Sequence, residues 1–192
     1  MTTETITFAS LKLAPEILKA LEESGYQTPT PIQAQAIPEA LLGRDLMAGA
    51  QTGTGKTAAF SLPMLQNLLP QANASASPAK HPIRALILVP TRELAIQVQE
   101  SIQIYAKHTN LRSLVVYGGV DMKEQVQVLR NGVEILIATP GRLLDHIGSK
   151  VANLSQVELL VLDEADRMLD MGFLPDLQRI INLIPAQRQT LL

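Results

Sequence analysis

Short apolar runs alternate with longer amphipathic segments along most of this chain. The apolar runs predict buried strands, because a parallel strand covered on both faces has no solvent side on which polar residues could alternate. They lie at residues 45–48, 85–89, 114–117, 135–138 and 159–162. The segments with helical spacing lie at residues 56–69, 93–108, 122–130, 142–148 and 173–184. Strands and helices in alternation predict an α/β fold with a doubly wound, mostly parallel sheet and helices on both faces.

Two features interrupt this alternation. Pro63 falls inside the first helical segment and should bend or cap it. Residues 70–82 are rich in Ala, Ser, Asn and Pro and show no periodicity, so they predict a mobile surface loop. The same alternation resumes after this loop. We therefore expect a single domain over residues 1–192.

Composition and charge narrow the class of protein. With 192 residues, of which 46% are hydrophobic, the chain can fill one core. Cysteine is absent, which excludes disulfides and thiolate metal sites. The N-terminus lacks the charged and apolar regions of a signal peptide, and no run approaches the length of a membrane span, so we expect a cytoplasmic protein. The net charge of −2 gives no overall attraction to nucleic acid, so such a partner would need a local patch or backbone amides.

Residues 50–57 read Ala-Gln-Thr-Gly-Thr-Gly-Lys-Thr, which is nearly the phosphate loop G-x-x-x-x-G-K-S/T. In such a loop, backbone N–H groups surround the phosphates, the lysine reaches the β and γ oxygens, and the hydroxyl holds Mg²⁺. Lys56 and Thr57 would take the last two roles. The predicted phosphate-binding residues are Gln51, Thr52, Gly53, Thr54, Gly55, Lys56 and Thr57.

Asp163-Glu164-Ala165-Asp166 follows the apolar run at 159–162 and supplies what a phosphate loop lacks. Asp163 is predicted to hold Mg²⁺, partly through water, and Glu164 to position or deprotonate a water molecule. The alternative is that Asp163 and Glu164 are simply a solvated pair of carboxylates. That alternative explains poorly why they lie directly after a buried strand. We therefore expect Lys56, Asp163 and Glu164 to be catalytic, with Thr57 and Asp163 at the metal.

Three further motifs also follow predicted strands. They are Pro90-Thr91-Arg92-Glu93, Gly118-Gly119 and Thr139-Pro140-Gly141-Arg142. In an open α/β sheet, ligands bind at the carboxyl ends of the strands. Each motif would therefore lie at the edge of the sheet that carries the phosphate loop.

In content and order, these motifs resemble the first RecA-like domain of a DEAD-box ATP-dependent RNA helicase, similar to the bacterial RhlE-type branch. The resemblance covers the whole chain and includes a Q motif region at residues 8–33. It implies a RecA-like P-loop fold, ATP with Mg²⁺, and adenine contacts from Phe8, Tyr26, Thr28 and Gln33. A glutamine amide donates and accepts at once, as adenine requires. Ala50 replaces the usual glycine, and the DEAD-box version of the loop tolerates it.

The resemblance also implies sequence-independent contacts with the sugar-phosphate backbone of RNA. The residue types suit this role, since guanidinium, hydroxyl and glycine amides can all approach phosphate. The predicted RNA-binding residues are Pro90, Thr91, Arg92, Glu93, Gly118, Gly119, Thr139, Pro140, Gly141 and Arg142. Alternatives remain open: Arg142 as a surface salt-bridge residue, Glu93 as a residue that orients Arg92 or a ribose hydroxyl, and the glycine pair as a turn.

In the family, a Ser-Ala-Thr motif and a second RecA-like domain with arginine fingers follow a segment like residues 187–192. We therefore expect this chain to be a monomeric fragment that lacks its second domain and is nearly inactive alone, and Asp166 to face the missing motif. A DNA helicase or translocase and a non-catalytic RNA-binding module are the alternatives. The three histidines lack ligand spacing and predict no metal site. Met168, Leu169, Met171 and Phe173 are expected to pack beneath the nucleotide site.

Overall fold

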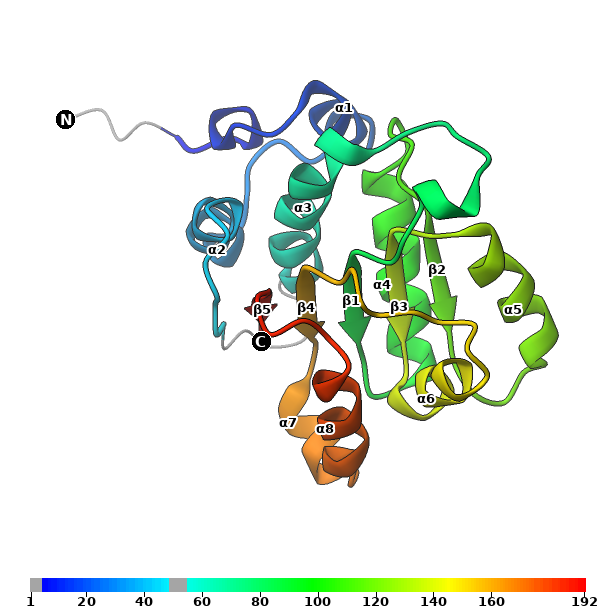
Figure 1. Ribbon diagram of the computed structural model, residues 1–192. Helices are drawn as coiled ribbons and strands as arrows, with labels where there is room; N and C mark the ends of the chain where they lie inside the picture. Colours follow the sequence, from blue (N-terminus) through cyan, green and yellow to red (C-terminus); the bar gives the residue numbers. More distant parts are fainter. Residues whose placement is uncertain (1–4, 49–54) are drawn as a thin grey trace.

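A single parallel sheet organises the molecule. The computed structural model describes residues 5–48 and 55–192. Within these residues, five strands lie in the order β2-β3-β1-β4-β5, and all neighbouring pairs are parallel (Figure 1). The strands are β1 (Ala85–Leu88), β2 (Ser113–Val116), β3 (Ile135–Ala138), β4 (Leu159–Leu162) and β5 (Gln189–Leu191). The predicted α/β fold with a parallel sheet is confirmed.

Helices connect the strands, and two of them precede the phosphate loop. These two, α1 (Pro15–Glu23) and α2 (Pro31–Leu41), follow a short 3-10 turn, η1 (Phe8–Leu11). Their apolar periodicity was not part of the predicted pattern. The remaining helices are α3 (Lys56–Leu68), α4 (Arg92–Tyr105), α5 (Met122–Asn131), α6 (Pro140–Gly148), α7 (Ala165–Asp170) and α8 (Leu174–Asn182).

The helices cover both faces of the sheet, and each face has its own apolar core. Successive strand residues point to opposite faces. Ile87 therefore packs with α1, α3 and α4 in one core, while Leu88 packs with residues of α5 to α8 in the other. Two-sided burial explains why the strands read as continuous apolar runs.

The register brings the carboxyl ends of four strands to one level. Leu88 at the end of β1 pairs with Ala138 of β3 and with Leu162 of β4, and Ala138 also pairs with Val116 of β2. The loops that follow these four strands consequently begin along the same edge. All the motifs after residue 88 fall on these loops.

Two local predictions differ from the structure. Residues 45–48 were expected to form a strand, but the structure has an isolated bridge there, between Leu46 and Leu191 of β5. Pro63 was expected to bend or cap its helix; it does not cap it, because α3 continues through it to Leu68, and the bend stays a prediction. Pro63 is buried within α3, where packing outweighs the proline's unfavourable propensity.

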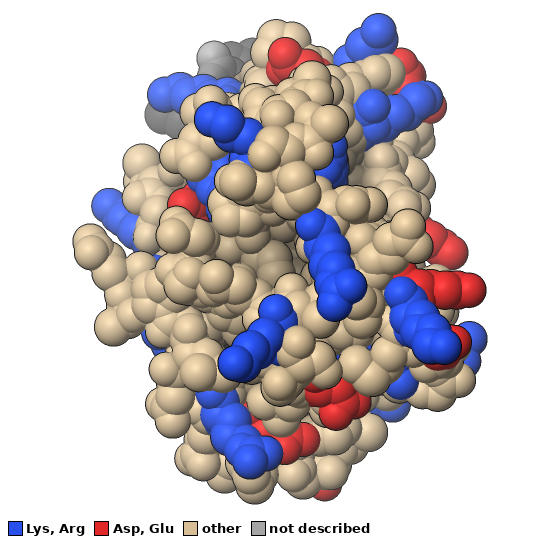
Figure 2. Space-filling model, turned by 45° about the vertical axis from the view of Figure 1, so that its right-hand side comes forward, with Lys and Arg blue, Asp and Glu red and all other residues tan. Residues whose placement is uncertain are grey.

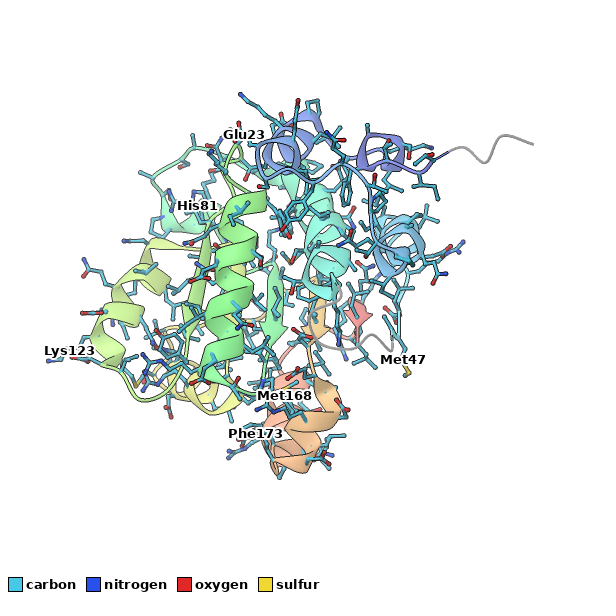
Figure 3. The ribbon with its side chains drawn as sticks, turned by 180° about the vertical axis from the view of Figure 1, so that it is seen from behind. Glu23, Met47, His81, Lys123, Met168 and Phe173 are labelled. Atoms are coloured by element: carbon cyan, nitrogen blue, oxygen red, sulfur yellow. The ribbon has the colours of Figure 1, made fainter. Side chains whose placement is uncertain are left out.

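The segment predicted as a mobile loop, residues 70–82, is anchored to the sheet. It contains two short 3-10 turns, η2 (Leu69–Gln71) and η3 (Pro78–Lys80). The buried ring of His81 pairs with the Glu134 carboxylate and donates from Nε2 to the Ser75 carbonyl at 2.7 Å. Gly132 makes room for this ring, because a Cβ there would lie 2.7 Å from the His81 Cβ. Most of the segment is exposed, as expected of a surface loop, and its end at His81 is fixed to the sheet. Figure 3 shows His81 at the end of the sheet remote from Met168 and Phe173.

The predicted packing around α7 holds for one side of that helix. Met168 is fully buried in the second core, and Phe173 packs against it. Leu169 and Met171 are 50% and 47% exposed, so their expected burial is wrong. At 100° per residue, neighbours of a buried position on a short helix turn away from the sheet. None of the helices among residues 5–48 and 55–192 has the length and apolarity needed to cross a membrane.

Candidate nucleotide site and adjoining nucleic-acid interface

A cavity of about 680 Å³ opens at the start of α3 and the end of β4. Its volume falls in the range of small-molecule and cofactor sites. It brings together three separate predicted motifs. The predicted residues that line it are Phe8, Tyr26, Thr28, Gln33, Gly55, Lys56, Thr57, Asp163 and Glu164. Gln51, Thr52, Gly53 and Thr54 lie outside the residues that the structure describes.

Lys56 and Asp163 form an ion pair inside this cavity. The Asp163 N–H donates to the Leu88 carbonyl at 3.0 Å, which extends the β1–β4 ladder and fixes the position of the carboxylate. The Lys56 Nζ lies 3.3 Å from the Asp163 Oδ1. Asp163 is 4% exposed, and this burial raises its pKa above the ordinary value, against the opposing effect of Lys56. The carboxylate is therefore a buried negative charge that one lysine only partly stabilises.

The residues predicted at the metal fit Mg²⁺ chemically. Thr57 is the second residue of α3 and lines the cavity with Asp163. Hydroxyl and carboxylate oxygens are ligands that Mg²⁺ accepts, and it usually combines one or two carboxylates with phosphates and water. No cluster of three or more His, Cys, Asp or Glu occurs among residues 5–48 and 55–192, and a nucleotide-linked magnesium ion does not require one.

Glu164 occupies a sharp turn between β4 and α7. Its φ of +56° is uncommon for a residue with a side chain and costs backbone strain. The turn directs the carboxylate toward the cavity, where Oε2 also accepts from the Arg167 guanidinium at 3.2 Å. A tight strand-to-helix turn thereby places two carboxylates, Asp163 and Glu164, at the same cavity wall.

Gln33 joins the Q motif region to the phosphate loop. Its Oε1 accepts from the Thr30 N–H at 3.0 Å, within the capping box that starts α2, and its Nε2 donates to the Gly55 carbonyl at 3.1 Å. Gly55 has a φ of +82°, and a Cβ there would lie 2.5 Å from Nε2. A primary amide has two N–H groups and two acceptor lone pairs, so one of each remains for a ligand. The adenine contact itself stays a prediction.

The two aromatic residues predicted to contact adenine differ in exposure. Phe8 is 4% exposed, and its N–H donates to the Gln27 carbonyl at 3.2 Å. Tyr26 is 53% exposed. Both rings line the cavity, so Phe8 is mostly part of the core while Tyr26 offers the larger free surface.

The three motifs predicted to bind RNA meet along one edge, because β2, β3 and β1 are adjacent in the sheet. We call residues 90–93, 118–121 and 139–142 the motif edge. Arg92, Glu93 and the three glycines of these motifs are exposed, whereas Pro90 and Pro140 are buried. The Thr91 hydroxyl caps α4 by accepting from the Leu94 N–H at 3.3 Å. Helix N-termini and glycine backbones consequently face solvent together, as phosphate binding requires.

The two arginines of the motif edge are placed differently. The Arg92 guanidinium carbon lies 4.9 Å from the centre of the Tyr117 ring, and Arg92 remains exposed. The Arg142 side chain is only 10% exposed and donates twice to the Val120 carbonyl, at 3.0 and 3.1 Å. Asp145 lies 3.6 Å from the Arg142 Nε, so the salt bridge that was the alternative role of Arg142 is present. It is longer than the hydrogen bonds to the Val120 carbonyl. In this structure Arg142 holds a neighbouring loop and does not present its guanidinium to solvent.

Three residues beside the motif edge were not among the predicted site residues: Tyr117, Gln125 and His146. Gln125 and His146 are buried in α5 and α6, and their side chains contact each other at 2.9 Å. A sequence signal exists for Gln125, since it shares the buried side of α5 with Leu129, four residues later. A polar residue at an apolar position of an amphipathic helix indicates a buried hydrogen-bonded group.

Charge is distributed in small groups over the side of the molecule that carries α5 and β2. Figure 2 shows this side, with Lys and Arg side chains separated by uncharged surface and Asp or Glu near several of them. Such a surface favours local contacts over a continuous electrostatic track.

Comparisons with known proteins agree with this geometry. The profile of the DEAD/DEAH box helicase family matches residues 30–192. Over 186 residues the chain is 48% identical to a protein named ATP-dependent RNA helicase CshA from Limosilactobacillus reuteri, covering 96% of this chain and 36% of the relative. It is 45% identical over 186 residues to DEAD-box ATP-dependent RNA helicase RhpA of Helicobacter pylori, covering 97% of this chain and 36% of the relative.

The chain spans about a third of the length of these curated relatives. The family profile nevertheless covers most of this chain, including the phosphate loop and the motif edge. The chain therefore belongs to the DEAD/DEAH box helicase family, as its motifs predicted.

Proposed function

We propose that this chain is the ATP-binding domain of an RNA-dependent ATPase that locally unwinds or remodels RNA duplexes. One observation carries the proposal. The Q motif amide of Gln33 is bonded to Gly55, beside the Lys56–Asp163 pair, so the residues predicted to contact adenine and those predicted to bind phosphate line one cavity. The names of the relatives, which are RNA helicases, support RNA as the second substrate.

In this proposal, ATP binds with its phosphates at the N-terminus of α3, whose free N–H groups favour anions. Lys56 turns from Asp163 to the β and γ oxygens, and Thr57 and Asp163 would hold Mg²⁺. The ion would neutralise the charge that develops on the phosphates. Glu164 orients a water molecule and accepts its proton as the water oxygen attacks the γ-phosphorus and the bond to the leaving ADP oxygen breaks.

RNA binds along the motif edge through its sugar-phosphate backbone, without sequence preference. Exposed Arg92 and the glycine amides make the contacts, and Arg142 acts by holding the loop at Val120. A second RecA-like domain, expected from the resemblance, completes both sites with arginine fingers and closes on one RNA strand, and hydrolysis reopens it. The RhlE-type subtype and the cytoplasmic location remain predictions.

Two titrations of this chain test the proposal. Calorimetry should show tighter binding of ADP than of GDP, and fluorescence anisotropy at low salt should show binding of single-stranded RNA with little dependence on its sequence. Equal affinity for ADP and GDP would remove the adenine assignment. Binding of single-stranded DNA at least as tight as that of RNA would favour a DNA-dependent P-loop enzyme.

A further inference from the structure

We propose that Gln125 is a positioning residue that fixes the motif edge in its RNA-binding shape, an inference that rests on the proposed function. Gln125 lies on α5 and is 7% exposed, so RNA does not reach it. It acts through the groups that its amide holds.

The amide of Gln125 makes three hydrogen bonds, which use both of its ends. Nε2 donates to the Tyr117 carbonyl at 3.2 Å. Oε1 accepts from the Arg142 guanidinium at 3.2 Å and from His146 Nε2 at 2.9 Å. Since a guanidinium only donates, the oxygen of the amide must face Arg142, and His146 must carry its proton on Nε2.

The surroundings of His146 favour its neutral form, and the bond to Gln125 needs only a proton on Nε2. Burial lowers its pKa, and the nearby Arg142 lowers it further, while Asp145 opposes them. Its Nδ1 is buried and has no hydrogen-bond partner in the part of the chain that the structure describes. The imidazole therefore serves as a fixed donor to Gln125.

These contacts hold both ends of the exposed glycine pair. Gln125 binds the carbonyl of Tyr117, directly before Gly118, and Arg142 binds the carbonyl of Val120, directly after Gly119. Glycine is the most flexible residue, so an unheld pair would lose much conformational entropy on binding RNA. The Tyr117 ring also lies beneath Arg92, which extends the influence of Gln125 to the loop after β1.

A second buried glutamine provides a comparison. Gln99 on α4 is 8% exposed and donates to the Ser113 carbonyl at 3.4 Å, at the opposite end of β2. Among residues 5–48 and 55–192, its side chain makes no hydrogen bond to the motif edge. Gln99→Met therefore serves as the matched control for Gln125→Met, since each change replaces a buried amide with an apolar side chain of similar length.

The experiment measures the affinity of this chain for a short, fluorescein-labelled single-stranded RNA by anisotropy, with the ADP affinity of each variant as the check on folding. Gln125→Met should weaken RNA binding about tenfold, corresponding to one lost charge-assisted hydrogen bond. ADP affinity should stay unchanged, and Gln99→Met should bind RNA like the unaltered chain. Gln125→Glu keeps the acceptors for Arg142 and His146 but cannot donate to the Tyr117 carbonyl. Its RNA affinity should therefore fall between that of Gln125→Met and that of the unaltered chain.

A change of less than twofold in Gln125→Met with ADP affinity intact would overturn the inference, and so would an equal loss in Gln99→Met. If Gln125→Met does not fold, Gln125→Glu decides: RNA affinity equal to that of the unaltered chain would overturn the inference. Amide resonances of Gly118 and Gly119 should also shift in Gln125→Met without RNA. A failure of the proposed function is distinct, because the unaltered chain itself would then show no RNA binding.

Discussion

Replacing Asp163 with asparagine should stabilise this domain in the absence of nucleotide. The Asp163 carboxylate is 4% exposed, and its burial raises its pKa even though Lys56 lies 3.3 Å away. Two unit charges at this distance attract by about 5 kcal/mol at an effective dielectric constant of about 20. Desolvation costs several kcal/mol for each buried ion, and the direction of the pKa change indicates that desolvation wins at Asp163.

The magnitude follows from replacing a buried charge with a neutral group of the same shape. Exchanging both partners of a buried ion pair for neutral residues often stabilises a protein by about 1–4 kcal/mol, whereas removing one partner loses that gain where the remaining charge stays buried. We expect about 1 kcal/mol, near the lower end of that range, because the Lys56 side chain is 21% exposed and keeps some solvation without its partner. For a domain of this size, about 1 kcal/mol raises Tm by about 2–4 °C.

The raised pKa of Asp163 also predicts how the stability gain of Asp163→Asn changes with pH. Between the ordinary value of 3.8 and its raised pKa, folded Asp163 holds more protons than unfolded Asp163. Stability consequently falls as the pH rises through that window, and the full cost is present above it. The advantage of Asp163→Asn should therefore be largest at neutral pH and shrink as the pH is lowered toward 4.

Calorimetric melting of both proteins at several pH values, without nucleotide, measures this difference. Asp166→Asn is the matched control, since Asp166 belongs to the same tetrapeptide but is exposed. A lower Tm for Asp163→Asn at neutral pH, or a gain that does not change with pH, would refute the reasoning.

Three further outcomes are expected. Gln33→Ala should weaken ADP binding by about 1–3 kcal/mol through the loss of one or two hydrogen bonds, and unchanged affinity in calorimetric titration would contradict the role of Gln33. Gly55→Ala should destabilise the domain by about 1–3 kcal/mol in urea unfolding, since a φ of +82° and a contact at 2.5 Å with the Gln33 Nε2 leave no room for a methyl group, and a loss below about 0.5 kcal/mol would count against it. Burial lowers the pKa of His146 below 6.5, so unfolded chains take up a proton first as the pH falls and stability is lost between 6.5 and that lower pKa. His146→Asn should show a weaker decrease of Tm from pH 7.5 to 5.5 than the unaltered chain, and equal slopes would refute this.

The sheet and the nucleotide motifs could be predicted because each depends on local sequence. A strand buried on both faces must be apolar throughout, and the phosphate loop and the DEAD tetrapeptide are contiguous. The bridge at Leu46 was harder to predict, because the strand pairing there depends on β5, which lies more than a hundred residues away. Propensity also left open that Pro63 would end its helix, which continues because Pro63 is buried in the core.

The contacts that shape the motif edge could not be read from the sequence for a related reason. Gln125 meets Arg142 and His146 only because α5 and α6 follow neighbouring strands, β2 and β3. Arginine in a phosphate-binding motif predicts an exposed guanidinium, and its burial against Val120 depends on that same packing. His81 and Glu134 are separated by more than fifty residues and anchor a segment whose composition is typical of a free loop.

The buried ionisable groups differ in kind between the two ends of the sheet. At the amino ends of the strands, His81 pairs with Glu134, and Arg84 pairs with Glu158 at 2.9 Å, so these groups stabilise the connections between strands. At the carboxyl ends, burial raises the pKa of Asp163 and lowers that of His146, and each change means that the fold disfavours the charged form. Glu164 adds backbone strain at the same edge, with its φ of +56°.

Such costs persist where a ligand recovers them, and a magnesium ion beside Asp163 or a phosphate before α3 would do so. Nucleotide binding should accordingly stabilise the unaltered chain more than it stabilises Asp163→Asn, which has already lost the cost that the ion removes.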